Sequence, residues 1–520
     1  MKQILAILFV ITISSIANAQ LSLQYTNTRQ APASHNMTIL DQKADDFGNI
    51  YIVYSDDPAK ILLLSKISIS GVTLWTDTVS LPSFQQVDVT KAKVNLGQNK
   101  LYVLFPGFGN PSPAGAIVAI YDFNGNYLNG FNASTMTNIW SYGVHGIHEK
   151  INGNIVVYYS YGDQFTANDT MYVKEFNPNF SLVWSVKYSV EKLSWHCPNY
   201  IDNNGNFYFT YNSDSISGAV HYLKSYTRKV DNAGNLIWTN VIPDVANKLI
   251  QKMYNGDIVL TGNNNPNGSI LGNNTGDIRT SRVSDANGVS SWTQLYNGPN
   301  NDRDEVHSVT VNQLNEVFIA GTEDLSKGFF RKYDQTGVLQ YEKLMPINSG
   351  TLGVYLSMLG NIHTISILNG NIHIKKILAT TGSTIDSMTA VVSFPIGMSG
   401  NTSNVGDDLF FTYSEGHCGA NHLEVLRFCT KAICTPETIS DAAGLNSKLT
   451  VYPNPASTLL YLKGFTDEQC SNMHILSVTG ERMAVRSDAG QVDISCLAAG
   501  MYILSYNFNK KTEYIRFVKE

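Results

Sequence analysis

The stretch NGNFYFTYNSD (residues 204–214), followed by HYLKSYTRKVDNAGNLIWT (residues 221–239), decides the fold of this chain. The aromatic residues of FYFTY alternate with other side chains, which is the period-2 pattern of a half-buried strand. Gly205 precedes this strand, and Gly234 precedes the run that ends in tryptophan, so both supply the positive φ of tight turns. The stretch therefore predicts a short antiparallel meander.

The same turn-and-strand start recurs through most of the chain. Eight starts occur at intervals of roughly 45 to 60 residues, close to or slightly above the periods of kelch and WD-type repeats. The other seven are GNIYIVYSD (48–56), QNKLYVLF (98–105), NGNIVVYYSYGD (152–163), NGDIVLTGN (255–263), LNEVFIAGTED (314–324), LGNIHTISI (359–367) and GDDLFFTYSEG (406–416). Such four-stranded units bury both faces only by stacking on one another, so we predict an all-β fold, a β-propeller.

The number of blades is either seven or eight. The last copy, residues 406–432, has its inner strands but lacks the outer strand that ends in an aromatic residue. The segment LSLQYT (residues 21–26) resembles that missing strand. Exchange of this segment into the last blade would close the ring and remove a free sheet edge, so we favour eight blades.

The aromatic residues that end the outer strands have a predicted structural role. They follow a turn in several copies and are Trp75, Trp184, Trp238, Trp292 and Tyr341. We expect the tryptophans among them to pack between blades. Trp140 and Trp195 stand outside this register, just before the inner strands of the third and fourth copies, so they are the first candidates for contact with a ligand.

Composition and the N-terminus indicate an exported protein. The net charge of −6 argues against nucleic-acid binding, which needs a concentrated basic surface. Residues 1–19 form a predicted signal peptide, because Lys2 precedes an apolar run and Ala-Asn-Ala gives a cleavage site between Ala19 and Gln20. No later segment is long and apolar enough to predict a transmembrane helix. Export permits disulfides, but the four cysteines of the repeats allow three pairings, which stay open.

The composition changes after the repeats. Residues 20–434 are the predicted propeller, residues 435–448 a polar linker, and residues 449–520 a small Ig-like β-sandwich of short strands. Its four motifs are YPNPA (452–456), HILSVTGERM (474–483), DISCLAAGMYIL (493–504) and TEYIRFVKE (512–520). The paired prolines predict an extended entry followed by a turn, and the glycines of the next two motifs suit hairpin turns.

Taken together, these four motifs resemble the C-terminal sorting domain of the type IX (Por) secretion system of Bacteroidetes. The resemblance implies recognition by the type IX machinery and its sortase at the outer membrane after Sec export. It also implies cleavage in or near the linker, leaving the protein secreted or attached to the cell surface. The residues that carry the resemblance are Tyr452, Pro453, Asn454, Pro455, Gly480, Gly500 and Tyr502.

The repeats contain no established catalytic motif: no nucleophile elbow, P-loop, dinucleotide fingerprint or HExxH helix is present. His145 and His148 form an H-x-x-H pair, but a metal site needs three or four convergent ligands, and we expect these histidines on loops. A second group, His417, Cys418 and His422 with Cys429 and Cys434 nearby, is more simply explained by disulfides and loops.

One acidic cluster has the right chemistry for calcium or for acid and base catalysis. Asp302, Asp304 and Glu305 lie together in NDRDEVH, where Arg303 offsets part of the charge. We favour a solvated loop between blades for this cluster.

Three functions remain. The leading hypothesis is an exported β-propeller that binds a glycan or protein ligand, or acts as a scaffold, at the cell surface, without cofactor, metal or assigned catalytic residue. The alternative is a secreted carbohydrate-active or other hydrolytic enzyme, and a third possibility is a structural surface-layer component. Clustered carboxylates at the channel mouth would support the enzyme, whereas aromatic and amide side chains there would support binding.

Overall fold

The structure is a computed structural model of the full chain. The residues it describes are 22–30, 37–45, 48–56, 60–79, 86–87, 91–108, 115–134, 141–162, 168–191, 197–217, 220–264, 276–300, 303–324, 327–347, 349–356, 361–368, 371–390, 399–405, 408–414, 422–429, 450–452, 456–463, 474–477, 482–483, 486–488, 491–495, 497–498, 500–508 and 511–519. They divide into two compact units, Met1–Glu437 and Thr438–Glu520.

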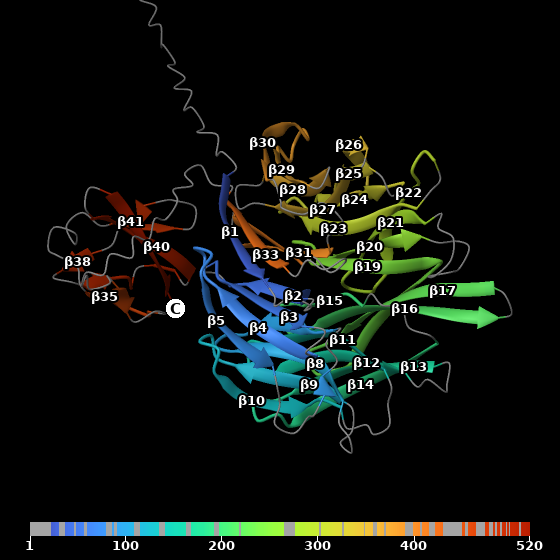
Figure 1. The fold of residues 1–520 in the computed structure, drawn as a ribbon, viewed down its shortest axis with the longest axis horizontal. Coiled ribbons are helices and arrows are strands. Elements are labelled where there is room, and N and C mark those ends of the chain that lie inside the picture. Colours follow the sequence, from blue (N-terminus) through green and yellow to red (C-terminus); the bar gives the residue numbers. More distant parts are fainter. Residues whose placement is uncertain are drawn as a thin grey trace, which may run out of the picture. The chain divides into compact units, whose positions relative to one another are not determined.

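The fold is all-β, as the sequence predicts. The described residues form strands and turns and contain no helix, so none of them belongs to a helix able to cross a membrane. Within them, the first unit contains eight antiparallel sheets (Figure 1).

Strands of the first four sheets follow one another along the chain. They are β2 (Met37–Ala44), β3 (Ile50–Asp56), β4 (Ile61–Ile67) and β5 (Thr73–Val79); β6 (Gln86–Val87), β7 (Lys93–Leu96), β8 (Leu101–Phe108), β9 (Gly115–Tyr121) and β10 (Tyr127–Asn132); β11 (Ser141–Glu149), β12 (Ile155–Gly162), β13 (Asn168–Phe176) and β14 (Leu182–Glu191); and β15 (Asn199–Ile201), β16 (Phe207–Ser217), β17 (Val220–Val230) and β18 (Leu236–Pro243).

The next four sheets repeat the arrangement, and the last of them takes its outer strand from the N-terminus. They are β19 (Val245–Lys252), β20 (Ile258–Asn264), β21 (Asp277–Val283) and β22 (Ser290–Tyr296); β23 (Glu305–Val311), β24 (Val317–Glu323), β25 (Lys327–Tyr333) and β26 (Leu339–Ile347); β27 (Ser349–Leu356), β28 (Ile362–Leu368), β29 (Asn371–Ile377) and β30 (Thr384–Ala390); and β31 (Ser399–Val405), β32 (Asp408–Ser414), β33 (His422–Cys429) and β1 (Ser22–Gln30).

Each of the eight starts found in the sequence covers all or most of the strand next to the inner strand of one sheet, from β3 to β32. The opening stretch gives β16, which runs antiparallel to β17, and Gly205 and Gly234 have positive φ in the turns on either side of these two strands. The predicted meander is therefore confirmed.

The sheets form a closed ring. Each inner strand contacts the inner strand of the next sheet, in the order β2, β7, β11, β15, β19, β23, β27 and β31, and β31 contacts β2 in turn. Strand β1 pairs with β33 along Ser22–Gln30, and Figure 1 shows its blue ribbon beside the orange one. The expected exchange of the N-terminal strand into the last sheet is present. A closed ring of mostly four-stranded antiparallel sheets is a β-propeller.

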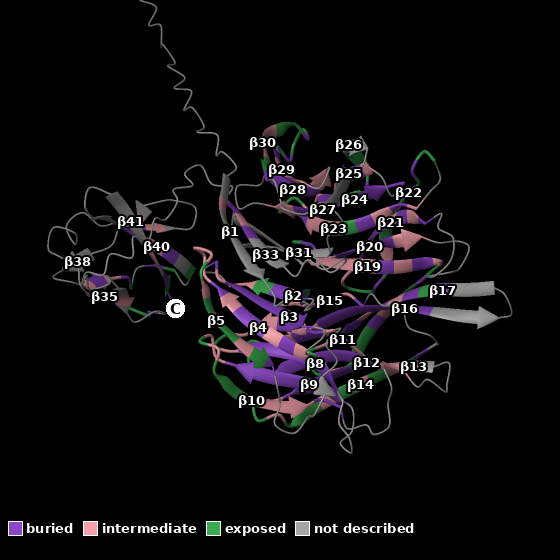
Figure 2. Cartoon of the chain, viewed as in Figure 1, coloured by how far each residue is buried: buried purple, intermediate pink, exposed green. Residues whose placement is uncertain are grey.

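The hydrophobic core lies between neighbouring sheets. Second strands such as β3 and β24 are buried along their whole length, whereas outer strands such as β5 and β22 alternate between partly buried and exposed residues (Figure 2). One core cluster joins Tyr51 of the first sheet to Phe105 of the second, and another joins Phe330 of the sixth to Ile362 of the seventh. Stacking of neighbouring sheets thus buries the faces that a single sheet leaves open.

The second unit is a small sandwich of two antiparallel sheets. One contains β34 (Thr450–Tyr452), β35 (Leu459–Lys463), β39 (Gln491–Asp493) and β38 (Arg486–Asp488), and the other β37 (Arg482–Met483), β36 (His474–Ser477), β40 (Gly500–Phe508) and β41 (Lys511–Lys519). Leu460 and Val492 of the first sheet share a core with Leu504 and Phe517 of the second.

Of the sorting-motif residues, three lie in described strands. Tyr452 ends β34, and the hydroxyl of the buried Tyr502 donates to the carbonyl oxygen of Ala498 at 3.0 Å. Gly500 begins β40, where it pairs with Lys519, rather than lying in a hairpin turn. The other four, Pro453, Asn454, Pro455 and Gly480, lie outside the described residues, as do Ala19 and Gln20.

Candidate ligand-binding site

A repeated contact between blades fixes the turns that surround the candidate site. The indole nitrogen of Trp238 donates to the carbonyl oxygen of Asp285 in the next sheet at 2.8 Å. The ring lies so close to Gly288 that a Cβ there would come within 2.7 Å of it. Three more tryptophans repeat this hydrogen bond across a blade boundary: Trp75 to Phe123, Trp184 to Asn232 and Trp292 to Gln335. The predicted packing role of these four tryptophans is confirmed.

The same turn carbonyl also accepts from a cation of the preceding sheet. Lys229 Nζ lies 3.3 Å from the carbonyl oxygen of Asp285, and Lys66 and Lys332 make the equivalent contact with Phe123 and Ala379. Two donors from one blade therefore fasten the turn of the next. This repetition gives the turns on this side of the ring a rigid backbone.

A pocket of about 640 Å³ opens among these turns. We call it the turn pocket. It lies where the inner strands β15, β19, β23 and β27 end, and its lining residues are Tyr200, Asp202, Asn203, Asn204, Gln251, Lys252, Met253, Tyr254, Gly256, Asp285, Thr310, Val311 and Leu356. Four consecutive sheets thus contribute to one pocket of the size that small ligands occupy.

Asp202 holds the turn on one wall of the pocket. Its Oδ1 atom accepts the backbone N–H groups of Asn204 and Asn206, and its Oδ2 atom accepts the side-chain amide of Asn206 at 2.9 Å. Gly205 completes the turn at φ +78°. An aspartate that accepts from the backbone two and four residues ahead is the usual way to close such a turn.

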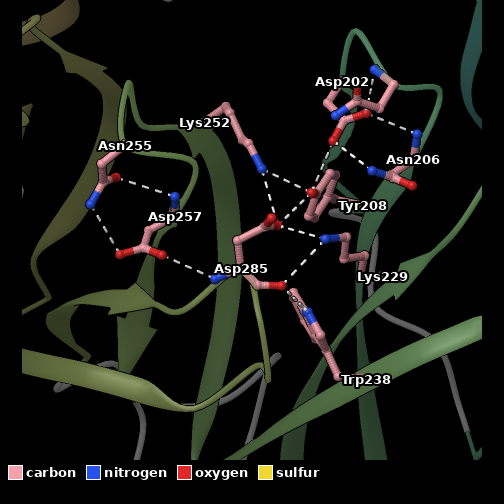
Figure 3. A network of polar contacts seen from close by, with 10 residues as sticks. Asp202, Asn206, Tyr208, Lys229, Trp238, Lys252, Asn255, Asp257 and Asp285 are labelled. Atoms are coloured by element: carbon pink, nitrogen blue, oxygen red, sulfur yellow. Dashed lines mark hydrogen bonds and ion pairs between the residues drawn. The ribbon is translucent and has the colours of Figure 1, made fainter.

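Asp285 is the centre of a polar network beneath the pocket (Figure 3). Its Oδ1 atom accepts from the hydroxyl of Tyr208 at 2.5 Å, from Lys229 Nζ at 2.9 Å and from Lys252 Nζ at 3.1 Å. Tyr208 also lies 3.1 Å from Asp202 Oδ2, but its single proton serves one carboxylate at a time. The two carboxylates of the pocket therefore lie within reach of the same phenol, which donates to one of them at a time.

This network works against acid catalysis by Asp285. Burial acts to raise the pKa of Asp285, but the hydrogen bonds from Tyr208, Lys229 and Lys252 outweigh it and hold the pKa below its ordinary value. A general acid for glycoside cleavage needs a raised pKa, so that it carries a proton at neutral pH. Asp285 is instead a fixed anion that positions two lysines.

The remaining lining of the turn pocket is aromatic and amide. The side chain of Tyr254 is 61% exposed at the tip of its turn, and Tyr200 is partly buried beside the ring of Tyr208. Asn203 and Asn204 are exposed, and Gln251 is partly buried. An exposed phenol together with neutral hydrogen-bonding groups provides a flat apolar face next to donors and acceptors.

The structure describes only some of the candidate residues taken from the sequence. Trp140 and Trp195 are outside the described residues, as is Asp302. The expected solvated loop is wrong for Asp304, which is fully buried and accepts the backbone N–H groups of Gly298 at 2.7 Å and Asp324 at 2.9 Å. Burial raises the pKa of Asp304.

Glu305, the last member of the acidic cluster, pairs with Arg303 and, at 3.5 Å, with Lys248. Its charge is therefore shared between two cations. The cluster is a set of structural contacts in the described residues rather than a free pair of carboxylates.

The histidine pair also differs from expectation. His145 and His148 lie in strand β11 and not on a loop. His148 Nε2 lies 2.6 Å from the side-chain oxygen of Asn199, and His145 Nε2 lies 2.8 Å from Ser160 Oγ. In the described residues no group of three or more histidine, cysteine, aspartate or glutamate side chains is arranged to hold a metal. Of the second group, His417, Cys418 and Cys434 lie outside the described residues, and His422 and Cys429 are the ends of β33.

Sequence reasoning missed the tyrosines and amides of the turn pocket. A usable signal was present in the turn MYNGD, because Tyr254 stands where the equivalent turns have Ile151 and Asn203. An aromatic residue at the exposed tip of a tight turn has no structural need to be there.

The closed ring of sheets and the pocket at its turns define a β-propeller protein. Residues 450–520 match the family model of the secretion system C-terminal sorting domain (Por secretion tail). This part of the chain is a sorting domain of that family, which confirms the resemblance and indicates that the protein is secreted.

Similar solved structures share low sequence identity with this chain. PorZ, an essential bacterial surface component of the type-IX secretion system of Porphyromonas gingivalis, is similar over 91% of this chain and 68% of its own, with 13% identity and a TM-score of 0.34. The Dos1 propeller is similar over 78% and 96%, with 12% identity and a TM-score of 0.49. Sqt1 of Saccharomyces cerevisiae is similar over 77% and 99%, with 8% identity and a TM-score of 0.45. No curated protein matches the chain at a significant level.

Proposed function

We propose that this protein is an exported binding module and that its turn pocket takes an oligosaccharide. The observation that carries the proposal is the lining of the pocket. Tyr200 and Tyr254 supply aromatic faces, and Asn203, Asn204 and Gln251 supply neutral donors and acceptors. Hydroxyl-rich sugar rings match such a lining, because their C–H faces pack on aromatic rings while their hydroxyls bond to amides.

Binding is favoured over hydrolysis by the state of the two carboxylates. Asp202 is used to close its own turn, and Asp285 holds Tyr208 and the two lysines. An enzyme of the hydrolytic type needs one carboxyl group that gives a proton and another that is free to attack or to activate water. The hydrolytic alternative would therefore need residues other than these two.

Delivery follows from the sorting domain. We propose that residues 1–19 are removed as a signal peptide between Ala19 and Gln20. The type IX machinery and its sortase would then act on residues 449–520, joined to the propeller by the linker 435–448. On this view the propeller of residues 20–434 has eight blades and works at the surface of a member of the Bacteroidetes or in its surroundings.

The test is glycan binding by the full chain. The protein is incubated with plant, host and bacterial polysaccharides, and both retention on the polymer and release of reducing ends are followed. We expect retention without product, and a loss of roughly tenfold in affinity for Tyr254→Ala. Tyr127→Ala removes a tyrosine that is 41% exposed on the outer strand β10, and should leave binding unchanged. Release of reducing ends would support the enzyme instead.

A further inference from the structure

A second cavity adjoins the turn pocket. Its volume is about 350 Å³, and we call it the inner-strand cavity. It is lined by Lys93, Val144, His145, Cys197, Pro198, Asn199, Lys248, Leu249 and Ile250. These residues belong to four consecutive inner strands or stand directly before them, so the cavity faces the middle of the ring.

The two cavities share two walls. Along β19, Lys248 to Ile250 line the inner-strand cavity and Gln251 to Tyr254 line the turn pocket. The segment around β15 divides in the same way: Cys197 to Asn199 line the inner-strand cavity, and residues from Tyr200 to Asn204 line the turn pocket. At a rise of about 3.3 Å per residue, a ligand reaching from Leu249 to Met253 spans roughly 13 Å, which requires an oligomer rather than one sugar ring.

The inner-strand cavity is positively charged. Lys93 and Lys248 line it, and none of its nine lining residues is a carboxylate. The nearest described acid partner of Lys248 is Glu305, at 3.5 Å, and Arg303 shares that carboxylate. The lysine side chain is only 16% exposed. Burial lowers the pKa of Lys248 in spite of Glu305, which is the sign of an ammonium group short of compensating charge.

β-Bulges aim the polar side chains of this cavity. In β19 the ladder with β20 shifts between Asn247 and Leu249, so Lys248 is the extra residue. In β11 the ladder with β12 shifts between Val144 and Gly146, so His145 is the extra residue of a second bulge. Bulges of this kind re-aim a side chain and are common beside binding sites. The bulge therefore sets the direction of the Lys248 side chain, which differs from the direction that a regular ladder would give it.

The histidines beside the cavity add no positive charge at neutral pH. Burial, helped by the charges of Lys91 and Lys93, lowers the pKa of His145 to about 3. Burial also lowers the pKa of His148 to about 4. The imidazoles are neutral, and the cationic groups that remain for a ligand are the two lysines.

We propose that the inner-strand cavity binds the carboxylate of an acidic sugar between Lys93 and Lys248, while the neighbouring sugar residues of the same chain occupy the turn pocket. This inference rests on the proposed function and assigns its substrate class, an oligosaccharide that contains uronic acid. Two ammonium groups with no lining carboxylate select for an anion, and the aromatic and amide pocket next to them selects for a sugar.

The experiment compares uronates with their methyl esters, which have the same rings without the charge. Binding of trimers of galacturonic, glucuronic and mannuronic acid and of their methyl esters to the full chain is measured by calorimetry. We expect one of the acids to bind about tenfold to hundredfold more tightly than its ester, the effect of one or two hydrogen bonds to a charged group. This comparison needs no variant and so does not depend on the folding of one.

Substitutions locate the effect. Lys248→Met and Lys93→Met should each remove most of the preference for the acid and leave affinity for the ester unchanged. Lys343→Met, which removes an exposed lysine of the outer strand β26, is the matched control and should keep the full preference.

The outcomes separate this inference from the proposed function. Equal binding of acid and ester, or a preference that survives both lysine variants, overturns the anion site alone. Acid binding that Tyr254→Ala leaves intact overturns the sugar site in the turn pocket alone. Failure of every uronate, or displacement of the acid by equimolar inorganic phosphate, overturns the uronate assignment.

Discussion

The contact between Gly288 and the indole ring of Trp238 makes a sharp prediction about the stability of the propeller. Gly288 has φ +72°, and a Cβ there would lie 2.7 Å from two ring atoms of Trp238. The ring is 7% exposed and is held by its hydrogen bond to Asp285, so it cannot swing aside. Gly288→Ala therefore adds both backbone strain and overpacking.

A matched control separates the two effects. Gly256 has φ +97° in the tight turn between β19 and β20, but a Cβ there meets nothing within 4 Å. Left-handed backbone costs a residue with a Cβ about 1 to 2 kcal/mol, so Gly256→Ala should lower the free energy of unfolding by that amount. Overpacking of a buried site costs about 1 to 3 kcal/mol more, so Gly288→Ala should lower it by about 2 to 5 kcal/mol.

Tryptophan fluorescence in urea is the appropriate assay. All six tryptophans precede residue 437, so the signal reports unfolding of the first unit. In a double-mutant cycle, Gly288→Ala made in the background of Trp238→Ala should cost no more than Gly256→Ala does, because the clash is gone. Equal costs for the two glycine substitutions in the native background would refute the argument that the ring and the turn are tightly packed.

Three further predictions concern ionisable side chains of the propeller and are measured by urea denaturation of the full chain. Lys150 and Glu175 form an ion pair in which each side chain is 3% exposed, so Lys150→Met should lower the free energy of unfolding by about 3 to 5 kcal/mol. Adding Glu175→Leu should recover most of that free energy, because no unpaired charge then stays buried. A double variant no more stable than Lys150→Met would count against the pairing. The lowered pKa of Asp285 means that its ionised form stabilises the fold above about pH 4. Asp285→Asn should therefore lower the free energy of unfolding at pH 7, and the difference in stability between the variant and the native chain should shrink as the pH falls below about 4. The pKa values of His145 and His148, about 3 and about 4, lie below the ordinary value near 6.5. Between pH 8 and pH 5.5 the unfolded chain therefore gains protons, and stability falls by about 1 kcal/mol per histidine. Glutamine at both sites should remove the part of the fall that these two histidines cause, while His307 and His363, whose pKa values are also lowered, keep theirs.

The fold could be predicted because its signals are local and repeated. In three copies the glycine of the turn and the tryptophan four residues later stand close together in the sequence, as Gly234 and Trp238 do. Their contact with the next blade follows from the repeat itself. The exchange of the N-terminal strand was predictable for a related reason, since the last copy lacked one strand and the N-terminus offered one.

The third sheet shows what the repeat pattern hid. Lys229 and Lys332 stand two residues before the turn of their own blade and reach the turn of the next one. In the third sheet that place holds Glu175, and Lys150 from a different turn pairs with it and reaches Asn232 in its stead. The sequence of this copy alone does not indicate that Lys150 and Glu175 meet, because 25 residues separate them. The carbonyl oxygen that Lys150 also contacts belongs to Asn232 in the neighbouring blade.

The candidate site was missed for the same physical reason. The turn pocket exists only because four inner strands end at one place, and its lining comes from turns spread over residues 200–356. The tryptophans are the most conspicuous aromatic residues of the sequence, but the described ones form contacts between blades and do not line the turn pocket.

The tight turns show where this repeat is free to acquire a function. In many of the described turns a glycine N–H donates to the carbonyl oxygen three residues before it, and three of these turns, with Gly153, Gly205 and Gly256, follow the inner strands β11, β15 and β19. That bond and the glycine fix the backbone, so the second residue of each turn contributes nothing to closing it. Its side chain is exposed in all three, as Ile151, Asn203 and Tyr254. A position under no structural demand, held rigidly at the rim of a pocket, can change its chemistry without loss of stability. The tyrosine at this place in the fifth sheet, Tyr254, is therefore the residue for which we propose contact with a ligand.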